Sequence, residues 1–219
     1  MIHLFCGYDP REAIGWHVFV HSVLRRASRP VAIHRLDSCG LPQGTNAFTL
    51  SRFLVPWLMG YRGHAIFADA ADMLCLGDIA QLDGLFDARK AVQVVQHDYQ
   101  TRNPRKYLGT KMEAENCDYP RKNWASLMLI NCEHDLWSMV DPAFLESADR
   151  MAVLQFTEAA PFEVGALPTY WNRLADEGQP VEGAQILHWT AGIPGFQHYT
   201  DAPGAALWRA ELADMMETA

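Results

Sequence analysis

The sequence gives little indication of disulfides, cysteine-based metal sites or membrane-spanning helices. Its five cysteines are an odd number and include no CxxC pair, so neither a disulfide framework nor a zinc knuckle is indicated. No apolar run approaches the roughly 18 residues that a membrane-spanning helix needs. The first residues, MIHLFCGYDPRE, lack the basic segment of a signal peptide. We therefore expect a cytoplasmic protein without a transmembrane segment.

Several motifs that identify common enzyme classes are also missing. The chain has no GxGxxG after its first predicted strand, no GxxxxGK[ST], no GxSxG and no HExxH. Dinucleotide enzymes, P-loop enzymes, α/β-hydrolases and zincins are therefore not supported. No internal repeat or linker marks a domain boundary, so residues 1–219 are expected to form a single domain.

Acidic side chains outnumber basic ones, but unevenly. The chain carries 18 Lys and Arg against 26 Asp and Glu, a net charge of −8, which disfavours binding to nucleic acid. Residues 141–219 hold 12 of the acidic and only 3 of the basic side chains. Residues 102–122, by contrast, hold six of the basic ones. This segment is either a solvated basic loop or a place where a small anion binds.

Apolar runs alternate with segments of helical spacing along the chain. Strands are predicted over residues 2–6, 30–37, 64–68, 90–97, 124–132 and 185–190. Helices are predicted over residues 11–28, 51–59, 78–86, 134–150, 169–174 and 202–217, the fourth of them broken near Asp141-Pro142. Residues 151–168 are expected to be irregular, with room for one strand. This order predicts an α/β fold with a mostly parallel central sheet and helices on both faces. Residues 98–122 are expected to form a long loop, which in a compact domain is usually functional or mobile.

Two carboxylates, Asp69 and Asp72, follow the predicted strand at 64–68. The carboxyl ends of strands are where open α/β sheets bind ligands, and carboxylate oxygens suit Mg²⁺ or Mn²⁺. Positions three apart in a strand face opposite sides, so both reach one ion only if the chain turns between them. The alternative is that the two side chains merely cap a turn.

Two further groups of side chains have more than one interpretation. His188 ends a late apolar strand and either completes a metal site or packs in the core. Arg121 and Lys122 could neutralise a diphosphate, and Trp124 could stack on a sugar or base or simply pack in the core. Residues 132–135, CEHD, have no partner at ligand spacing and are not expected to bind metal.

Five segments in order resemble the GT-A glycosyltransferases, most closely glycosyltransferase family 8 and its short uncharacterised bacterial and phage-like relatives. The resemblance covers roughly residues 2–196. FCGYDPRE (5–12) resembles the family's first strand and nucleotide-contacting loop, and SRFLVP (51–56) resembles its RxxxP helix. Residues 69–79 resemble the DxD…LGDI stretch. LPTYWNRL (167–174) resembles LPxxWNxL, and His188 matches a late metal-binding histidine.

The resemblance implies a GT-A fold and a metal-dependent glycosyltransferase. Its donor would be a nucleotide sugar, with a UDP-sugar favoured, and its acceptor a glycan or another hydroxyl-bearing molecule. The family retains anomeric configuration, but no carboxylate in this sequence can be named as a nucleophile, so the stereochemistry stays open. Mn²⁺ or Mg²⁺ would be bound by Asp69, Asp72 and His188.

Roles for further residues also follow from the resemblance. The donor would contact Tyr8, Asp9, Arg52, Asp69, Arg121 and Ser126. The sugar or acceptor side would be lined by Trp124, Trp171 and Asn172. Catalytic roles fall to Lys122, Asn123 and Gln155, the last matched to the family's D-Q pair. Residues 98–122 would act as a lid that excludes water.

Two departures from the family pattern leave other functions open. DxD has become Asp69-x-x-Asp72, and the family's HxxGxxKP motif lacks, after His188, the lysine that meets the diphosphate. Lys122 or Arg121 is a candidate to replace that lysine. A catalytically degenerate nucleotide-sugar-binding protein is one alternative. A sugar nucleotidyltransferase is another, although the missing Gly-rich loop near the N-terminus counts against it.

Overall fold

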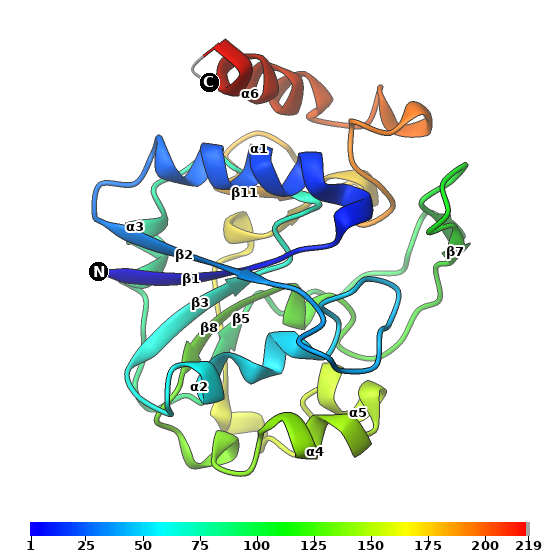
Figure 1. The fold of residues 1–219 in the computed structure, drawn as a ribbon. Coiled ribbons are helices and arrows are strands. Elements are labelled where there is room, and N and C mark those ends of the chain that lie inside the picture. Colours follow the sequence, from blue (N-terminus) through cyan, green and yellow to red (C-terminus); the bar gives the residue numbers. More distant parts are fainter. Residues whose placement is uncertain (218–219) are drawn as a thin grey trace.

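A six-stranded sheet forms the centre of the computed structural model, which describes residues 1–217 (Figure 1). Its strands, in spatial order, are β2 (Val31–Leu36), β1 (Ile2–Gly7), β3 (His64–Ala68), β8 (Leu127–Asn131), β5 (Val92–Val94) and β9 (Val164–Ala166). β1 pairs in parallel with β2 and β3, and β5 pairs in parallel with β9. Only β8 runs antiparallel to its neighbours, β3 and β5. The sheet is therefore mostly parallel, as the sequence predicts.

Two smaller sheets join segments that are distant in the sequence. One joins β10 (Arg173–Leu174), β11 (Ile186–His188) and β4 (Met73–Cys75), and the other is a short hairpin of β6 (Arg105–Lys106) and β7 (Ala114–Glu115). β4 runs antiparallel to β11 and sets Met73 opposite His188. The amide of Trp189 donates to the carbonyl of Asp72 at 2.9 Å. This pairing places the end of β11 beside the turn that follows β3.

Helices cover both faces of the sheet (Figure 1). On one side lie α1 (Ala13–Leu24), preceded by a 3₁₀ turn at Pro10–Glu12, and α6 (Ala205–Glu217), which packs on α1. On the other side lie α2 (Val55–Leu58), α4 (Pro142–Ser147) and α5 (Arg150–Leu154). A short α3 (Ile79–Asp83) is capped by Asp78, whose side chain accepts from the amide of Ala80. No helix of residues 1–217 combines the length and apolar character that crossing a bilayer demands.

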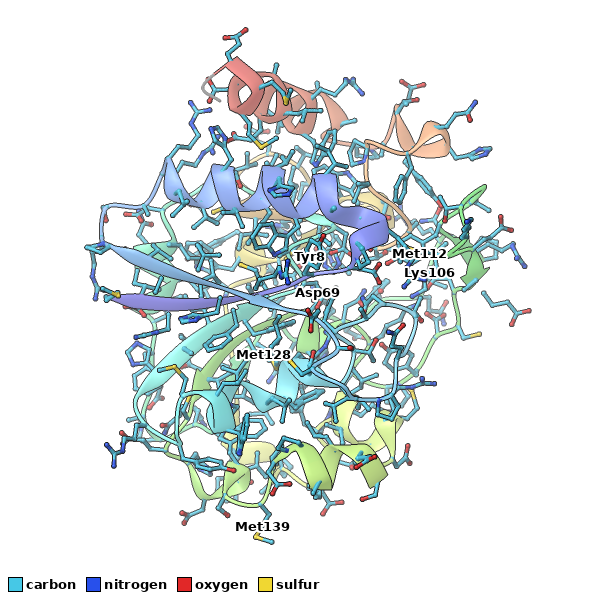
Figure 2. The ribbon with its side chains drawn as sticks, viewed as in Figure 1. Tyr8, Asp69, Lys106, Met112, Met128 and Met139 are labelled. Carbon is cyan, nitrogen blue, oxygen red and sulfur yellow. The ribbon has the colours of Figure 1, made fainter. Side chains whose placement is uncertain are left out.

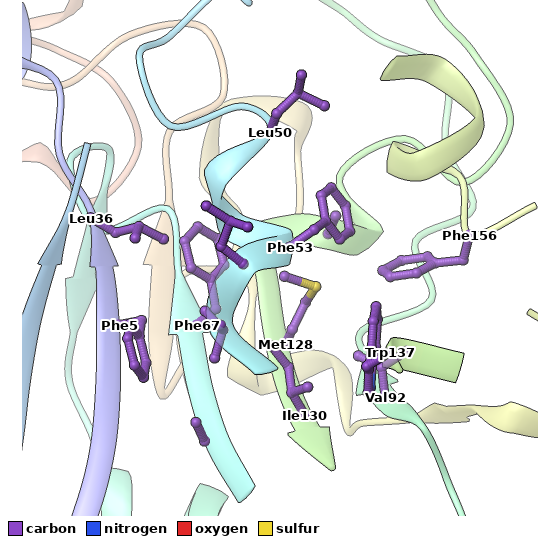
Figure 3. Close-up of a cluster of buried hydrophobic side chains, with 14 of the residues drawn as sticks. Phe5, Leu36, Leu50, Phe53, Phe67, Val92, Met128, Ile130, Trp137 and Phe156 are labelled. Carbon is purple, nitrogen blue, oxygen red and sulfur yellow. The ribbon is translucent and has the colours of Figure 1, made fainter. Parts of the chain in front are cut away.

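Strand alternation divides the buried side chains between two layers. Leu4 and Cys6 of β1 pack on the α1 side with Phe19, whereas Phe5 faces the opposite layer with Phe53 (Figure 3). Burying each large apolar side chain contributes about 1.5–3 kcal/mol before the loss of conformational entropy. These layers fix the strand ends from which the candidate site is built.

Several predicted boundaries differ from those in the structure. The strands predicted at 2–6, 30–37 and 64–68 are confirmed, but the one predicted at 124–132 begins at Leu127 because Trp124–Ser126 forms a 3₁₀ turn. The predicted helix at 169–174 is a 3₁₀ turn followed by β10, and α5 lies in a stretch expected to be partly irregular. β4 was not predicted because three buried residues after a turn show no alternation.

Candidate functional site

The chain turns sharply between Asp69 and Asp72, directly after β3. The amide of Asp69 donates to the carbonyl of Ser126 at 2.8 Å, which ties the turn to the start of β8. Ala70 has a left-handed φ of 57°, and the amide of Ala71 donates back to Asp69 at 2.5 Å. Both carboxylates are buried, with 7% and 4% of their surfaces exposed. Because the chain turns here, the side chains of Asp69 and Asp72 are able to reach one ion, as predicted for such a turn.

A glycine lets α1 approach this turn. A Cβ atom at Gly15 would lie 1.9 Å from the carbonyl oxygen of Ala71. No larger residue fits there unless the helix or the turn moves. The position of α1 and the conformation of the turn are therefore coupled.

Asp69, Asp72 and His188 form one buried cluster. One ligand atom from each lies within 4.8 Å of the others, and Nε2 of His188 is 3.4 Å from Oδ2 of Asp72. Oδ1 of Asp72 is buried and has no hydrogen-bond partner. A buried, unpartnered carboxylate oxygen is costly, and a cation would satisfy it. Two carboxylates and an imidazole are a donor set that Mn²⁺ or Mg²⁺ accepts.

A chain of hydrogen bonds fixes the imidazole of His188. The amide nitrogen of Asn172 donates to Oγ of Ser126 at 2.8 Å, and that hydroxyl donates to the carbonyl of Asn123 at 2.6 Å. The amide oxygen of Asn172 therefore faces His188 and accepts from Nδ1 at 3.0 Å. This arrangement leaves Nε2 directed toward Asp72, where a metal ion would bind.

The cluster shifts the pKa values of its own members. Burial raises the pKa of Asp69 to about 7, although the nearby charge of Arg52 acts in the opposite direction. Burial acts to lower the pKa of His188, but the carboxylates of Asp72, Asp69 and Asp176 together outweigh it, so this pKa lies above its ordinary value. A divalent cation among these groups would favour the ionised carboxylates and the neutral imidazole.

Arg52 lies behind Asp69 and is itself buried. Its Nη1 lies 2.7 Å from Oδ1 of Asp69 and donates to the carbonyl of Ala125 at 2.8 Å. Its Nε donates to the carbonyl of Thr49, and the guanidinium lies over the ring of Phe67 at 5.2 Å. In this structure the guanidinium therefore holds Asp69 and two loop carbonyls in place.

Tyr8 and Asp9 lie at the end of β1. Asp9 is fully buried, and its oxygens accept from the backbone and guanidinium of Arg11 and from the amide of Ala47. The carboxylate thereby ties the start of α1 to the loop around residue 47. Tyr8 is half-buried, with Arg35 4.8 Å above its ring.

The residues predicted after position 120 separate into two groups. Asn123 and Ser126 line the cavity that contains the cluster. Arg121 instead donates to the carbonyls of Gln155 and Phe156, at 2.7 and 3.0 Å. Lys122 donates to Oδ1 of Asn116 at 2.8 Å.

The predicted aromatic contacts lie outside the cavity walls. Arg121 lies 5.3 Å from the ring of Trp124, whose indole nitrogen donates to the carbonyl of His97. Trp171 is 1% exposed and packs in the core on the α1 side of the sheet. Asn172 reaches the site only through His188 and Ser126.

Two adjoining cavities share part of their walls, and one of them contains the cluster. The first has a volume of about 100 Å³ and contains Asp69, Asp72 and His188 in its wall. The second has a volume of about 360 Å³ and extends toward Lys122 and Arg150. The residues common to both walls are Thr45, Thr49, Lys106, Tyr119, Asn123, Leu154 and Thr190.

Sequence reasoning missed Glu12 and Lys106. Glu12 is 1% exposed, both of its carboxylate oxygens lack a hydrogen-bond partner, and burial together with Asp72 raises its pKa well above the ordinary value. Lys106 lines the first cavity from β6. Glu12 lies in the segment 5–12 that resembles the glycosyltransferases, and Lys106 lies in the basic segment 102–122. Nothing in the spacing of these two residues distinguished them from charged side chains exposed to solvent.

Comparisons with known proteins give one clear sequence relative and several structural ones. No family model matches the sequence. Protein CDI of Arabidopsis thaliana is 34% identical over 227 residues, covering 96% of this chain and 86% of that protein.

The structural relatives are glycosyltransferases at 13% identity. The chain superposes on the bifunctional glycosyltransferase WbbM with a TM-score of 0.67 (99% of this chain, 50% of that one) and on GlyE of Streptococcus pneumoniae with 0.65 (99% and 62%). It superposes on the galactosyltransferase LgtC, solved with donor and acceptor sugar analogs, with 0.62 (97% and 96%). The chain thus spans half of WbbM and under two thirds of GlyE. The predicted GT-A fold is confirmed, and the assignment to family 8 stays a prediction.

Proposed function

Because the chain belongs to the family of Protein CDI from Arabidopsis thaliana and has a GT-A glycosyltransferase fold, we propose that it is a metal-dependent glycosyltransferase. It moves a sugar from a nucleotide-sugar donor to a hydroxyl-bearing acceptor. The observation that carries the proposal is the buried cluster of Asp69, Asp72 and His188 at the end of β3.

The donor set fits a divalent cation. Asp69, the unpartnered Oδ1 of Asp72 and Nε2 of His188 would hold Mn²⁺ or Mg²⁺. When bound, the ion would neutralise charge on the nucleoside diphosphate that leaves. Burial and the nearby charge of Asp72 raise the pKa of Glu12, and a bound cation would favour the ionised form of this carboxyl.

The protein's own side chains orient this site. Asn172 and Ser126 hold His188 with Nε2 toward the cluster, and Arg52 holds Asp69. The smaller cavity suits the diphosphate, and the 360 Å³ cavity beside it suits the sugar and acceptor. Asn123, in the wall of both, stays our candidate for contact with the transferred sugar.

Residues 98–122 fit the role of a cover over the donor. The segment is anchored where the amide of Tyr107 donates to the carbonyl of Ala191 at 2.6 Å and where Arg102 donates its amide to Glu177 at 2.6 Å. A cover held at these points would exclude water from the donor and limit its hydrolysis.

Finer features of the proposal come from the resemblance to family 8. They are a UDP-sugar as donor, a glycan as acceptor and retention of anomeric configuration. Gln155 offers its backbone carbonyl to Arg121, so a catalytic role for its side chain rests on the motif alone. A single domain over residues 1–219 and a cytoplasmic location, with all five cysteines free, complete the proposal.

A donor panel tests the function. The protein is incubated with UDP- and GDP-sugars and Mn²⁺, with and without chelator, and released nucleoside diphosphate is measured. We expect release from one donor that stops with chelator and falls at least a hundredfold in Asp72→Ala. Metal-dependent donor binding without release, even with a broad set of acceptors, would instead identify a degenerate binding protein. Release of pyrophosphate from a sugar phosphate and a nucleoside triphosphate would identify a nucleotidyltransferase.

A further inference from the structure

Lys106 directs a charged group into the cavity that holds the acidic cluster. It lies on β6, and its side chain forms part of the wall together with Asp69, Asp72 and His188. Figure 2 labels Lys106 and Asp69 among the side chains of the molecule. Arg52 and Lys106 are the two Lys or Arg side chains in that wall, and Arg52 is already engaged by Asp69 and two carbonyls. Lys106 is therefore the cation that remains available to a ligand.

The ammonium of Lys106 has no hydrogen-bond or ion-pair partner within the described residues. Its near contact is the ring of Tyr107, 5.5 Å away. Burial lowers the pKa of Lys106, and the charge of Asp72 acts in the opposite direction. A half-buried ammonium in this position is costly unless an anion binds beside it.

The hairpin that carries Lys106 is held in place. The amide of Tyr107 donates to the carbonyl of Ala191 at 2.6 Å, and the amide of Leu108 donates to the hydroxyl of Tyr199 at 2.9 Å. These bonds set Lys106 beside the segment that follows His188. Lys106 thus occupies a defined position at the site and is not a freely moving surface lysine.

The two cations predicted from the sequence to meet a diphosphate are both engaged elsewhere. Arg121 donates to the carbonyls of Gln155 and Phe156. Lys122 donates to Asn116 and lies 3.6 Å from a carboxylate oxygen of Asp118. Neither lines the cavity that contains the cluster.

We infer that Lys106 binds the donor diphosphate and supplies the positive charge that the segment after His188 lacks. This inference rests on the proposed function and names a residue for it. The two negatively charged phosphates would lie between the metal cluster and the ammonium, which forms charge-assisted hydrogen bonds to their oxygens.

A pair of lysine variants tests the assignment. Lys106→Met keeps the length of the side chain and removes the charge, and Lys111→Met removes an exposed charge from the same hairpin. Binding of UDP, GDP and inorganic pyrophosphate is measured by calorimetry with Mn²⁺, and binding of Mn²⁺ is measured alone. We expect Lys106→Met to weaken diphosphate binding about tenfold or more, since charge-assisted bonds are lost. Lys111→Met should match the wild type, and Lys106→Arg should recover most of the affinity.

Mn²⁺ alone separates a direct contact from a structural role. Removing a positive charge near the carboxylates should leave Mn²⁺ binding unchanged or tighter, whereas a distorted site would weaken both ligands. If Lys106→Met lost the binding of Mn²⁺ and of the diphosphate together, the assignment would be overturned. It would also be overturned if Lys106→Met bound Mn²⁺ and the diphosphate with wild-type affinity. If the wild-type protein binds no nucleoside diphosphate with Mn²⁺, the proposed function fails as well.

Discussion

At the scale of single residues, the site depends on side chains that hold other side chains. Asn172 is fully buried and connects His188 to Ser126, so its amide determines which imidazole nitrogen faces Asp72. Metal ligands in proteins commonly depend on such partners for orientation and basicity. The resemblance assigned Asn172 to the sugar side. In the structure its amide is needed both as a donor to Ser126 and as an acceptor from His188.

Replacing Asn172 with Ala should weaken Mn²⁺ binding by roughly 10- to 100-fold, the range found when such supporting partners are removed. The control is Asn131→Ala, which removes a buried amide at the far end of β8, where it donates to the carbonyl of Ala88. Both variants should lose similar stability, and only Asn172→Ala should lose metal affinity in a Mn²⁺ titration. Equal Mn²⁺ affinity in the two variants would show that Asn172 does not support a metal ligand.

At the scale of elements, the site depends on how closely α1 lies against the turn at residues 69–72. The approach is possible because Gly15 has no Cβ, and it also brings the buried Glu12 toward Asp72. The helix and the turn therefore act as one unit, and a change in either should reach the carboxylates.

Gly15→Ala should cost about 1–3 kcal/mol in the free energy of unfolding, as overpacking against backbone does, and should also weaken Mn²⁺ binding. Gly84→Ala is the matched control, because a Cβ there meets its nearest atoms at 3.5 Å and its backbone is helical. That variant should be neutral or slightly stabilising. Chemical denaturation together with a Mn²⁺ titration checks both; a Gly15→Ala protein with unchanged metal affinity would refute the coupling.

The elements that sequence alone predicted well are continuous apolar runs and segments of helical spacing. β1, β2 and β3 belong to the first kind, α1 and α6 belong to the second, and all five were predicted within a few residues. β4 and β10 are too short to show a period, and each exists because it pairs with β11. The same limit applies to the site: Asp69, Asp72 and His188 carry motif signals, whereas Lys106 reaches the cavity through a hairpin anchored to distant residues.

At the scale of the whole molecule, acidic side chains of residues 141–219 make internal contacts that hold the fold together. Asp176 accepts from the amides of Thr190 and Ala191, and Glu177 accepts from Thr101 and Arg102. Glu211 of α6, which is 3% exposed, binds α1. Part of the acidic excess of the chain is therefore engaged in internal contacts.

Glu211→Gln should lower the free energy of unfolding at pH 7 by about 1–3 kcal/mol, because Arg26 and His21 lose a charged acceptor. Burial acts to raise the pKa of Glu211, but its hydrogen bonds to these two side chains and the charges of Arg26 and Arg25 together outweigh it, so the pKa is lowered. Its stabilisation is therefore present above the pKa of an unfolded glutamate and is lost as the pH falls through the lowered value.

Denaturant unfolding of the two proteins between pH 7 and about pH 3.5 measures this difference, which should shrink toward the acid end. Glu217→Gln, an exposed position on the same helix, should match the wild type throughout. A Glu211→Gln deficit that stayed constant with pH would mean that the charge of Glu211 is not its cause.

The most direct test of the central claim is a crystal structure of the protein grown with Mn²⁺ and UDP or GDP, with anomalous diffraction collected at the manganese edge. We predict one strong anomalous peak among Asp69, Asp72 and His188, bonded to the diphosphate, with the ammonium of Lys106 on the phosphates' other side. A nucleotide bound elsewhere, or an ordered nucleotide with no manganese peak at these three residues, would contradict the account.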